Sequence, residues 1–102
     1  MLFLVQENEL IWKRTFQVLY FYSAEVSFNQ KMCLMLNKME TIHHNADFFA
    51  IDADYFNGVL RRFNINSLPT VVILKKSKEI KRITNILKTV DFMDIFSDIC
   101  NL

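Results

Sequence analysis

Runs of apolar residues, separated by short polar segments, divide the chain into strand-like and helix-like stretches. Residues 16–22 and 48–52 are apolar almost throughout, which is typical of strands covered on both faces. Residues 27–43 instead repeat apolar positions at steps of three and four, which predicts a helix with one buried stripe. The members of that stripe are Phe28, Met32, Met35, Leu36, Met39 and Ile42.

Shorter patterns predict the remaining elements. Acids precede bases in residues 7–14, an order that suits a helix dipole, and Asp54 is placed to cap the helix that follows it. Residues 79–83 alternate polar and apolar side chains, as an edge strand with one wet face does. The other expected elements are a strand at 2–5, a turn at 44–47, helices at 55–63 and 89–100, a loop at 64–68, a strand at 69–74 and a tight turn at 75–78.

The resulting order is strand, helix, strand, helix, strand, helix, strand, strand, helix. Alternating strands and helices indicate parallel strands joined by crossover helices, and two consecutive strands indicate an antiparallel hairpin. We therefore expect an α/β fold with a mixed central sheet of about five strands and helices on both faces. The 102 residues are enough for a single domain, 1–102, and too few for two.

Composition excludes several classes of protein. A hydrophobic content of 52% supports a packed core and argues against disorder. The net charge of +1 provides no strong field for nucleic acid or an anionic membrane, so we expect neither as a partner. The apolar runs are far shorter than the roughly 20 residues of a membrane helix. Without a signal peptide after Met1 we expect a cytoplasmic protein if Met1 is the native start, and otherwise the compartment is unknown.

Candidate ligand residues have structural explanations. Cys33 and Cys100 belong to no CxxC pair, so they form neither a disulfide framework nor a zinc site. Adjacent His43 and His44 point apart at a helix end, where solvated histidines are expected. With no third ligand near Asp52 and Asp54, we expect no metal. Basic residues in and after the tight turn indicate a solvated sheet edge, whose charges prevent strand-to-strand aggregation. They are Lys75, Lys76, Lys78, Lys81 and Arg82. A role in binding an acidic partner or RNA stays open.

Three stretches resemble the thioredoxin family: VLYFYSAE from residue 18, KMCLMLNKM from residue 31, and AIDADYFNGVLRRFNINSLPTVVILKKSKEI from residue 50. Together they cover about residues 16–100 in the family's order. Asp52, Phe63 and the Leu68-Pro69-Thr70 sequence fall where its pattern expects them. The resemblance implies the thioredoxin-like fold. It also implies a role in cell redox homeostasis, which no other feature of the sequence indicates. It also implies a cis bond between Leu68 and Pro69, beside a groove that pairs with extended peptides.

The same resemblance shows what is missing. The family's WCGPC signature needs one thiol that attacks as a thiolate and a second that resolves the mixed disulfide. Val26-Ser27-Phe28-Asn29-Gln30 stands there, so Ser27 and Gln30 replace the two cysteines and Val26 the tryptophan. Tyr20 replaces a buried aspartate of the family. Ser27 and Gln30 can instead form a capping box for the helix, which we favour over Ser27 as a nucleophile.

These observations predict an interaction module without thiol chemistry, without a cofactor and without a catalytic residue. It would bind a protein or an extended peptide in the groove beside Pro69; the expected groove residues are Tyr22, Val26, Ser27, Phe28, Leu68, Pro69 and Thr70. One alternative is an atypical monothiol oxidoreductase that uses Cys33, with glutathione as a co-substrate. Another is a structural domain of a larger assembly. The sequence leaves the partner and the oligomeric state open.

Overall fold

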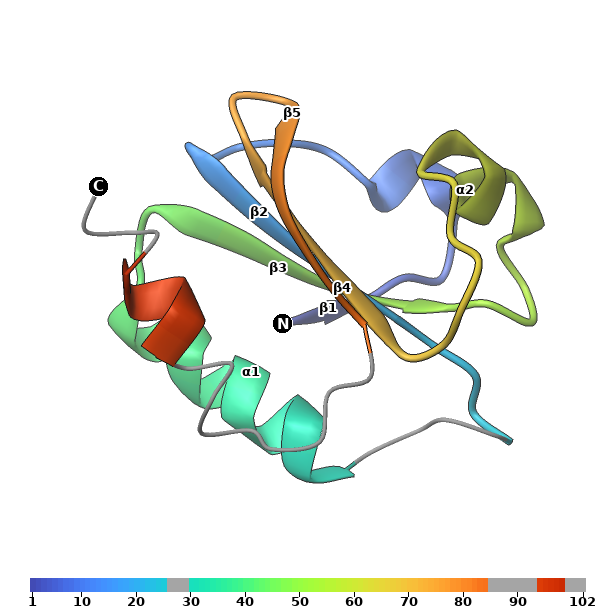
Figure 1. Ribbon diagram of the computed structural model, residues 1–102, viewed down its shortest axis with the longest axis horizontal. Coiled ribbons are helices and arrows are strands. Elements are labelled where there is room, and N and C mark those ends of the chain that lie inside the picture. The colour runs from blue at the N-terminus through green and yellow to red at the C-terminus, as the bar shows by residue number, and fades with distance from the viewer. Residues whose placement is uncertain (26–29, 85–93, 99–102) are drawn as a thin grey trace.

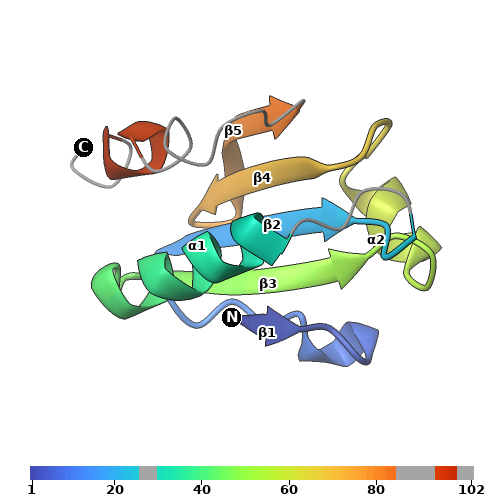
Figure 2. The same ribbon diagram turned by 90° about the horizontal axis from the view of Figure 1, so that it is seen from below.

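The computed structural model describes residues 1–25, 30–84 and 94–98. Five strands form one mixed sheet in the order β1-β3-β2-β4-β5 (Figure 2). The strands are β1 (Leu2–Phe3), β2 (Phe16–Tyr22), β3 (Ala46–Asp52), β4 (Thr70–Lys75) and β5 (Lys78–Thr84). β3 pairs in parallel with both β1 and β2, whereas β4 is antiparallel to β2 and β5. The predicted mixed sheet with a terminal hairpin is therefore confirmed.

Helices cover both faces of this sheet (Figure 1). One face carries α1 (Gln30–Ile42) and the helical residues 94–98, and the other carries α2 (Asn57–Arg62) with the short 3-10 helix η1 (Glu7–Glu9). All seven residues of β2 are buried because this central strand has a neighbour on each edge and cover on each face. Tyr20 and Tyr22 face α1, while Leu19 and Phe21 face the other layer.

The segment at residues 7–14 is not the helix that its charge order predicted. Only Glu7–Glu9 is helical, and the chain then runs on without helical structure. The carboxylate of Asp47 accepts hydrogen bonds from the backbone N–H groups of Lys13 and Arg14 at 2.8 and 2.9 Å. A helix through residue 14 would direct those donors at its own carbonyl groups, so this contact with β3 replaces the helix.

Two other expectations at helix ends are wrong. The residue before α2 is Phe56 rather than Asp54, and it makes no side-chain capping bond. Asp54 instead accepts a hydrogen bond from the hydroxyl of Ser23 at 3.0 Å. At the end of α1, Ile42 is 55% exposed and lies outside the buried stripe. β3 also begins at Ala46, which shortens the turn expected at 44–47.

His43 corrects the expectation of two solvated histidines. Its ring is half-buried and packs edge-on against Phe96 from residues 94–98, with the ring centroids 4.8 Å apart. This burial lowers the pKa of His43 below its usual value. His44 is exposed, as expected. One histidine therefore belongs to the packing between α1 and the C-terminal helical residues.

Candidate functional site

The C-terminal ends of β2 and β3 lie side by side where the sequence places its candidate site. Tyr22 and Asp52 are paired in the parallel register. The two connections that leave these strands are tied together, because the Ala53 N–H donates to the Tyr22 carbonyl at 2.7 Å and Ser23 donates to Asp54. The Asp54 N–H closes a turn onto the Asp52 carboxylate at 2.9 Å. Hydrogen bonds therefore join the ends of β2 and β3 to each other.

The loop before β4 reaches the same end of the sheet. Thr70 pairs in register with Phe21 of β2, and its hydroxyl donates to the Ser67 carbonyl at 2.6 Å. The peptide bond between Leu68 and Pro69 is cis. Leu68 is 37% exposed. We call the exposed part of residues 66–69 the Pro69 surface.

Two predicted groove residues are buried. Tyr22 is 8% exposed and Thr70 only 1%, so neither presents an open side chain to a partner. Tyr22 stacks on Tyr20 with centroids 5.4 Å apart, and burial, the Asp52 carboxylate and Cys33 together raise its pKa. The expected apolar contact between Tyr22 and a partner is therefore wrong, because this side chain belongs to the core beneath the site. Val26, Ser27 and Phe28 lie outside the described residues.

The one described cysteine is packed inside the protein. Cys33 lies in the first half of α1, is 6% exposed, and belongs to the core cluster between α1 and the sheet. Removal from water raises the pKa of its thiol. The expected burial of Cys33 is confirmed. Gln30 is the first residue of α1 and is exposed, whereas Ser27 and Asn29 lie outside the described residues, so the capping box stays a prediction.

Comparisons with known proteins agree with this arrangement. Thioredoxin H2 of Arabidopsis thaliana is 35% identical over 48 residues, a match that covers 47% of this chain and 36% of the length of that protein. Mitochondrial thioredoxin 3 of Saccharomyces cerevisiae in its oxidized form superposes with a TM-score of 0.79 at 20% identity, covering 96% of this chain and 94% of the other. Thioredoxin NaTrxh of Nicotiana alata gives 0.78 at 20% identity, covering 95% and 90%. The chain has a thioredoxin-like fold.

No family model matches this thioredoxin-like chain. At 20% identity, the solved structures establish its fold and not its activity. The chain also departs from the family's pattern in sequence, because Ser27 and Gln30 stand where the resemblance places the two thiols.

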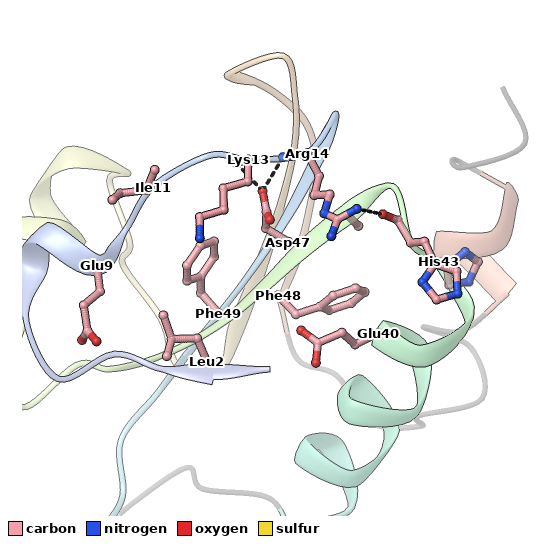
Figure 3. Close-up of a pocket in the computed structure, with 12 residues that line it drawn as sticks. Leu2, Glu9, Ile11, Lys13, Arg14, Glu40, His43, Asp47, Phe48 and Phe49 are labelled. Atoms are coloured by element: carbon pink, nitrogen blue, oxygen red, sulfur yellow. Dashed lines mark hydrogen bonds between the residues drawn. The ribbon is translucent and has the colours of Figure 1, made fainter.

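The thioredoxin-like chain has a concave region at the opposite end of the sheet from the Pro69 surface. A cleft of about 360 Å³ lies beside the start of β3, between the connection that precedes β2 and the end of α1 (Figure 3). Lys13, Arg14 and Asp47 line it together with Leu2 and Phe49. No pattern in the sequence predicted this cleft. Its lining comes from segments far apart in the chain, and residues 11–14 had been assigned to a helix.

Two further observations limit what the described residues can do. Within residues 1–25, 30–84 and 94–98, no group of three or more His, Cys, Asp and Glu side chains is placed to hold a metal ion. None of the helices in that same part of the chain has the length and apolarity needed to cross a bilayer. Two candidate binding sites remain among the described residues, the Pro69 surface and the cleft beside β3.

Proposed function

We propose that this thioredoxin-like chain is a protein-interaction module that binds an extended peptide at the Pro69 surface and performs no thiol–disulfide exchange. The observation that carries the proposal is the state of the thiols. Ser27 and Gln30 occupy the two positions that the resemblance assigns to the reactive cysteines, and neither side chain can form a disulfide. Cys33 is buried, with a raised pKa.

The burial of Cys33 also argues against the monothiol alternative. A nucleophilic cysteine reacts as the thiolate and needs access to its substrate. Desolvation raises the pKa of Cys33, so less thiolate forms near neutral pH, and the thiol lies among apolar side chains under α1. Both effects reduce its reactivity. The interaction role therefore fits the described residues better than catalysis through Cys33 does.

The exposed side chain of Leu68 supports the choice of the Pro69 surface. Leu68 lies on the loop between α2 and β4, two residues before Thr70, which the β2–β4 ladder holds in place, and its side chain offers apolar contact there. Extended peptides gain affinity from backbone pairing and specificity from such exposed side chains. Leu68 is therefore the position at which partner binding should be most sensitive to substitution.

The absence of thiol exchange is tested by insulin reduction in the presence of dithiothreitol. We expect the wild-type chain to leave the background rate unchanged. Ser27→Cys/Gln30→Cys restores the spacing of the two thiols and serves as the matched variant, since it shows whether the scaffold can still support the reaction. Acceleration by the wild-type chain that disappears in Cys33→Ser would overturn the proposal in favour of the monothiol reaction.

Peptide binding is tested by selecting extended peptides on the immobilised chain and measuring their affinity for Leu68→Glu. We expect a loss of about tenfold, which corresponds to one buried apolar contact. The matched control is Ile80→Glu, because Ile80 is 42% exposed on β5, away from the Pro69 surface. Equal affinity for both variants would contradict the assignment of the binding surface.

A further inference from the structure

The cleft beside the start of β3 carries uneven charge. Its three acidic side chains already have partners: Glu9 accepts from two backbone N–H groups at 2.7 and 2.8 Å. Asp47 accepts from two more at 2.8 and 2.9 Å, and Glu40 pairs with the N-terminal amine. These hydrogen bonds orient the carboxylates of Glu9 and Asp47 without cancelling their charge, whereas Glu40 is paired with a cation of the chain itself.

The cations that line the cleft are not neutralised. Within the described part of the chain, no carboxylate lies at ion-pairing distance from the Lys13 ammonium or the Arg14 guanidinium. Arg14 donates from Nη1 to the His44 carbonyl at 2.9 Å, which orients the guanidinium without cancelling its charge (Figure 3). The cleft therefore offers fixed positive charge to a ligand.

The β4–β5 turn extends this positive charge beyond the cleft. The Lys76 N–H donates to the Thr15 carbonyl at 3.0 Å, which places the turn next to Arg14 in space. Lys75 and Lys78 face each other across the hairpin, although like charges directly opposite each other are unfavourable. No carboxylate among the described residues pairs with any of these three lysines. We call the combined surface the basic end; its cations are Lys13, Arg14, Lys75, Lys76 and Lys78.

The walls of the cleft are partly apolar. Leu2 is 41% exposed and Ile11 is 55% exposed, and both line the cleft with Phe49 (Figure 3). A volume of about 360 Å³ lies at the lower end of the range for ligand pockets, enough for one large side chain and its neighbours. The cleft can therefore take an apolar side chain while the basic end contacts acidic groups on either side of it.

We propose that the cleft and the basic end bind an acidic peptide segment with an apolar anchor residue. The anchor occupies the space between Leu2 and Ile11, and carboxylates beside it lie against Lys13 and the β4–β5 turn. Charge complementarity favours an acidic partner, since the five cations of the basic end outnumber the three carboxylates that line the cleft. A single-stranded nucleic acid is a poorer fit, because Phe48 and Phe49 are 2% and 5% exposed and cannot serve as stacking platforms.

This site is separate from the Pro69 surface. β2 runs from the basic end at Phe16 to the candidate site at Tyr22, so the two surfaces lie at opposite ends of the sheet (Figure 2). Leu68→Glu should leave binding at the basic end unchanged, and Lys13→Glu should leave binding at the Pro69 surface unchanged. Failure of one proposal is therefore distinguishable from failure of the other.

Fluorescence anisotropy with the full chain tests the proposal. The probe is a short labelled peptide of alternating glutamate and aspartate around one phenylalanine. We expect saturable binding that weakens as salt rises above about 0.15 M, where screening shortens the reach of the charges. Lys13→Glu and Lys76→Glu should each weaken binding by about fivefold. Lys31→Glu is the matched control, because Lys31 is exposed in the first turn of α1, at the other end of that helix.

Three outcomes would overturn the proposal. The first is an affinity that neither Lys13→Glu nor Lys76→Glu changes relative to Lys31→Glu, with folding of each variant verified by circular dichroism. The second is equal binding of a peptide with serine in place of phenylalanine, which would remove the role of the cleft. The third is tighter binding of oligouridylate or of phosphatidylserine vesicles that Lys13→Glu and Lys76→Glu both weaken, which would assign the basic end to that ligand.

Discussion

The guanidinium of Arg82 on β5 donates from Nη1 to the backbone carbonyl of Asn64 at 2.9 Å, and from Nη2 to that of Phe63. Asn64 follows α2 with a φ of 53°, and the Ile65 N–H closes back onto the Leu60 carbonyl at 2.9 Å. This is a Schellman ending, in which a left-handed residue terminates the helix. One edge-strand side chain therefore holds the end of α2 and the start of the loop that leads to the Pro69 surface.

Removal of this contact should destabilise the fold. Arg82→Ala leaves the partly buried Phe63 carbonyl and the exposed Asn64 carbonyl without their charged donor, and we expect a loss of about 1.5 kcal/mol in the free energy of unfolding. Urea denaturation measures the change, and Lys81→Ala is the control because Lys81 is the exposed neighbour on the same strand. Equal midpoints and slopes for the two variants would show that the Arg82 contacts contribute nothing to stability.

The sheet was predictable because its strands carry their own signal. Residues 16–22 are apolar except for Gln17 and rich in aromatic side chains over a full strand length, and the structure gives β2 the same bounds, Phe16–Tyr22. The helix expected at 7–14 failed because its only support was charge order. The hydrogen bonds from Lys13 and Arg14 to Asp47 join segments more than thirty residues apart. No local pattern reports such a contact.

The candidate site was predictable in location but not in exposure. Resemblance placed Leu68, Thr70 and Tyr22 at one end of the sheet, and the β2–β4 and β2–β3 registers put Thr70 opposite Phe21 and Tyr22 opposite Asp52. Whether a strand-end side chain is open depends on what covers it, which is a tertiary property. Tyr22 is covered by Tyr20 and by Phe3 of β1, whose ring lies 6.4 Å away edge-on.

The Cys33 thiol should react slowly in the folded protein. Burial blocks access, and the raised pKa leaves less thiolate at any given pH near neutrality. In a Cys100→Ser background, so that only Cys33 is followed, we expect iodoacetamide alkylation to be at least about tenfold slower without urea than with it. As pH increases, the alkylation rate of the folded protein should rise at a higher pH than the alkylation rate of the unfolded protein. Coincident pH profiles would contradict the burial of the thiol.

The burial of His43 predicts how stability depends on pH. Its pKa is lowered in the folded state, so the unfolded chain binds the proton more readily and stability falls as pH decreases. The stability that the neutral His43 imidazole contributes is fully present above about pH 6.5, the usual pKa of histidine, and is lost as pH falls through the lowered pKa. Urea denaturation from neutral to mildly acidic pH should show a steeper loss for the wild type than for His43→Phe, which keeps a ring against Phe96.

His44→Asn is the matched control, because His44 is the exposed neighbour of His43 at the same helix end. We expect its pH dependence to match that of the wild type. Identical slopes for the wild type, His43→Phe and His44→Asn would show that packing of the imidazole against Phe96 is not linked to its proton.

Both central residues of the turn between β4 and β5 have a left-handed backbone conformation. Lys76 and Ser77 have φ values of 50° and 70°, the left-handed region that a two-residue hairpin turn requires. Side chains there cost about 1 kcal/mol each, whereas glycine adopts the region freely. Ser77→Gly should therefore raise the free energy of unfolding by about 0.5–1 kcal/mol, after allowance for the greater flexibility of glycine in the unfolded chain.

Ser77→Gly also separates the conformation of the turn from its charge. Every lysine of the basic end is kept, so affinity for the acidic peptide should stay at the wild-type value while stability rises in urea denaturation. Lys76→Gln gives the opposite result, because it removes a cation while keeping a side chain in the same conformation: affinity falls and stability changes little. If Ser77→Gly were less stable than the wild type, the left-handed turn could not be a source of strain.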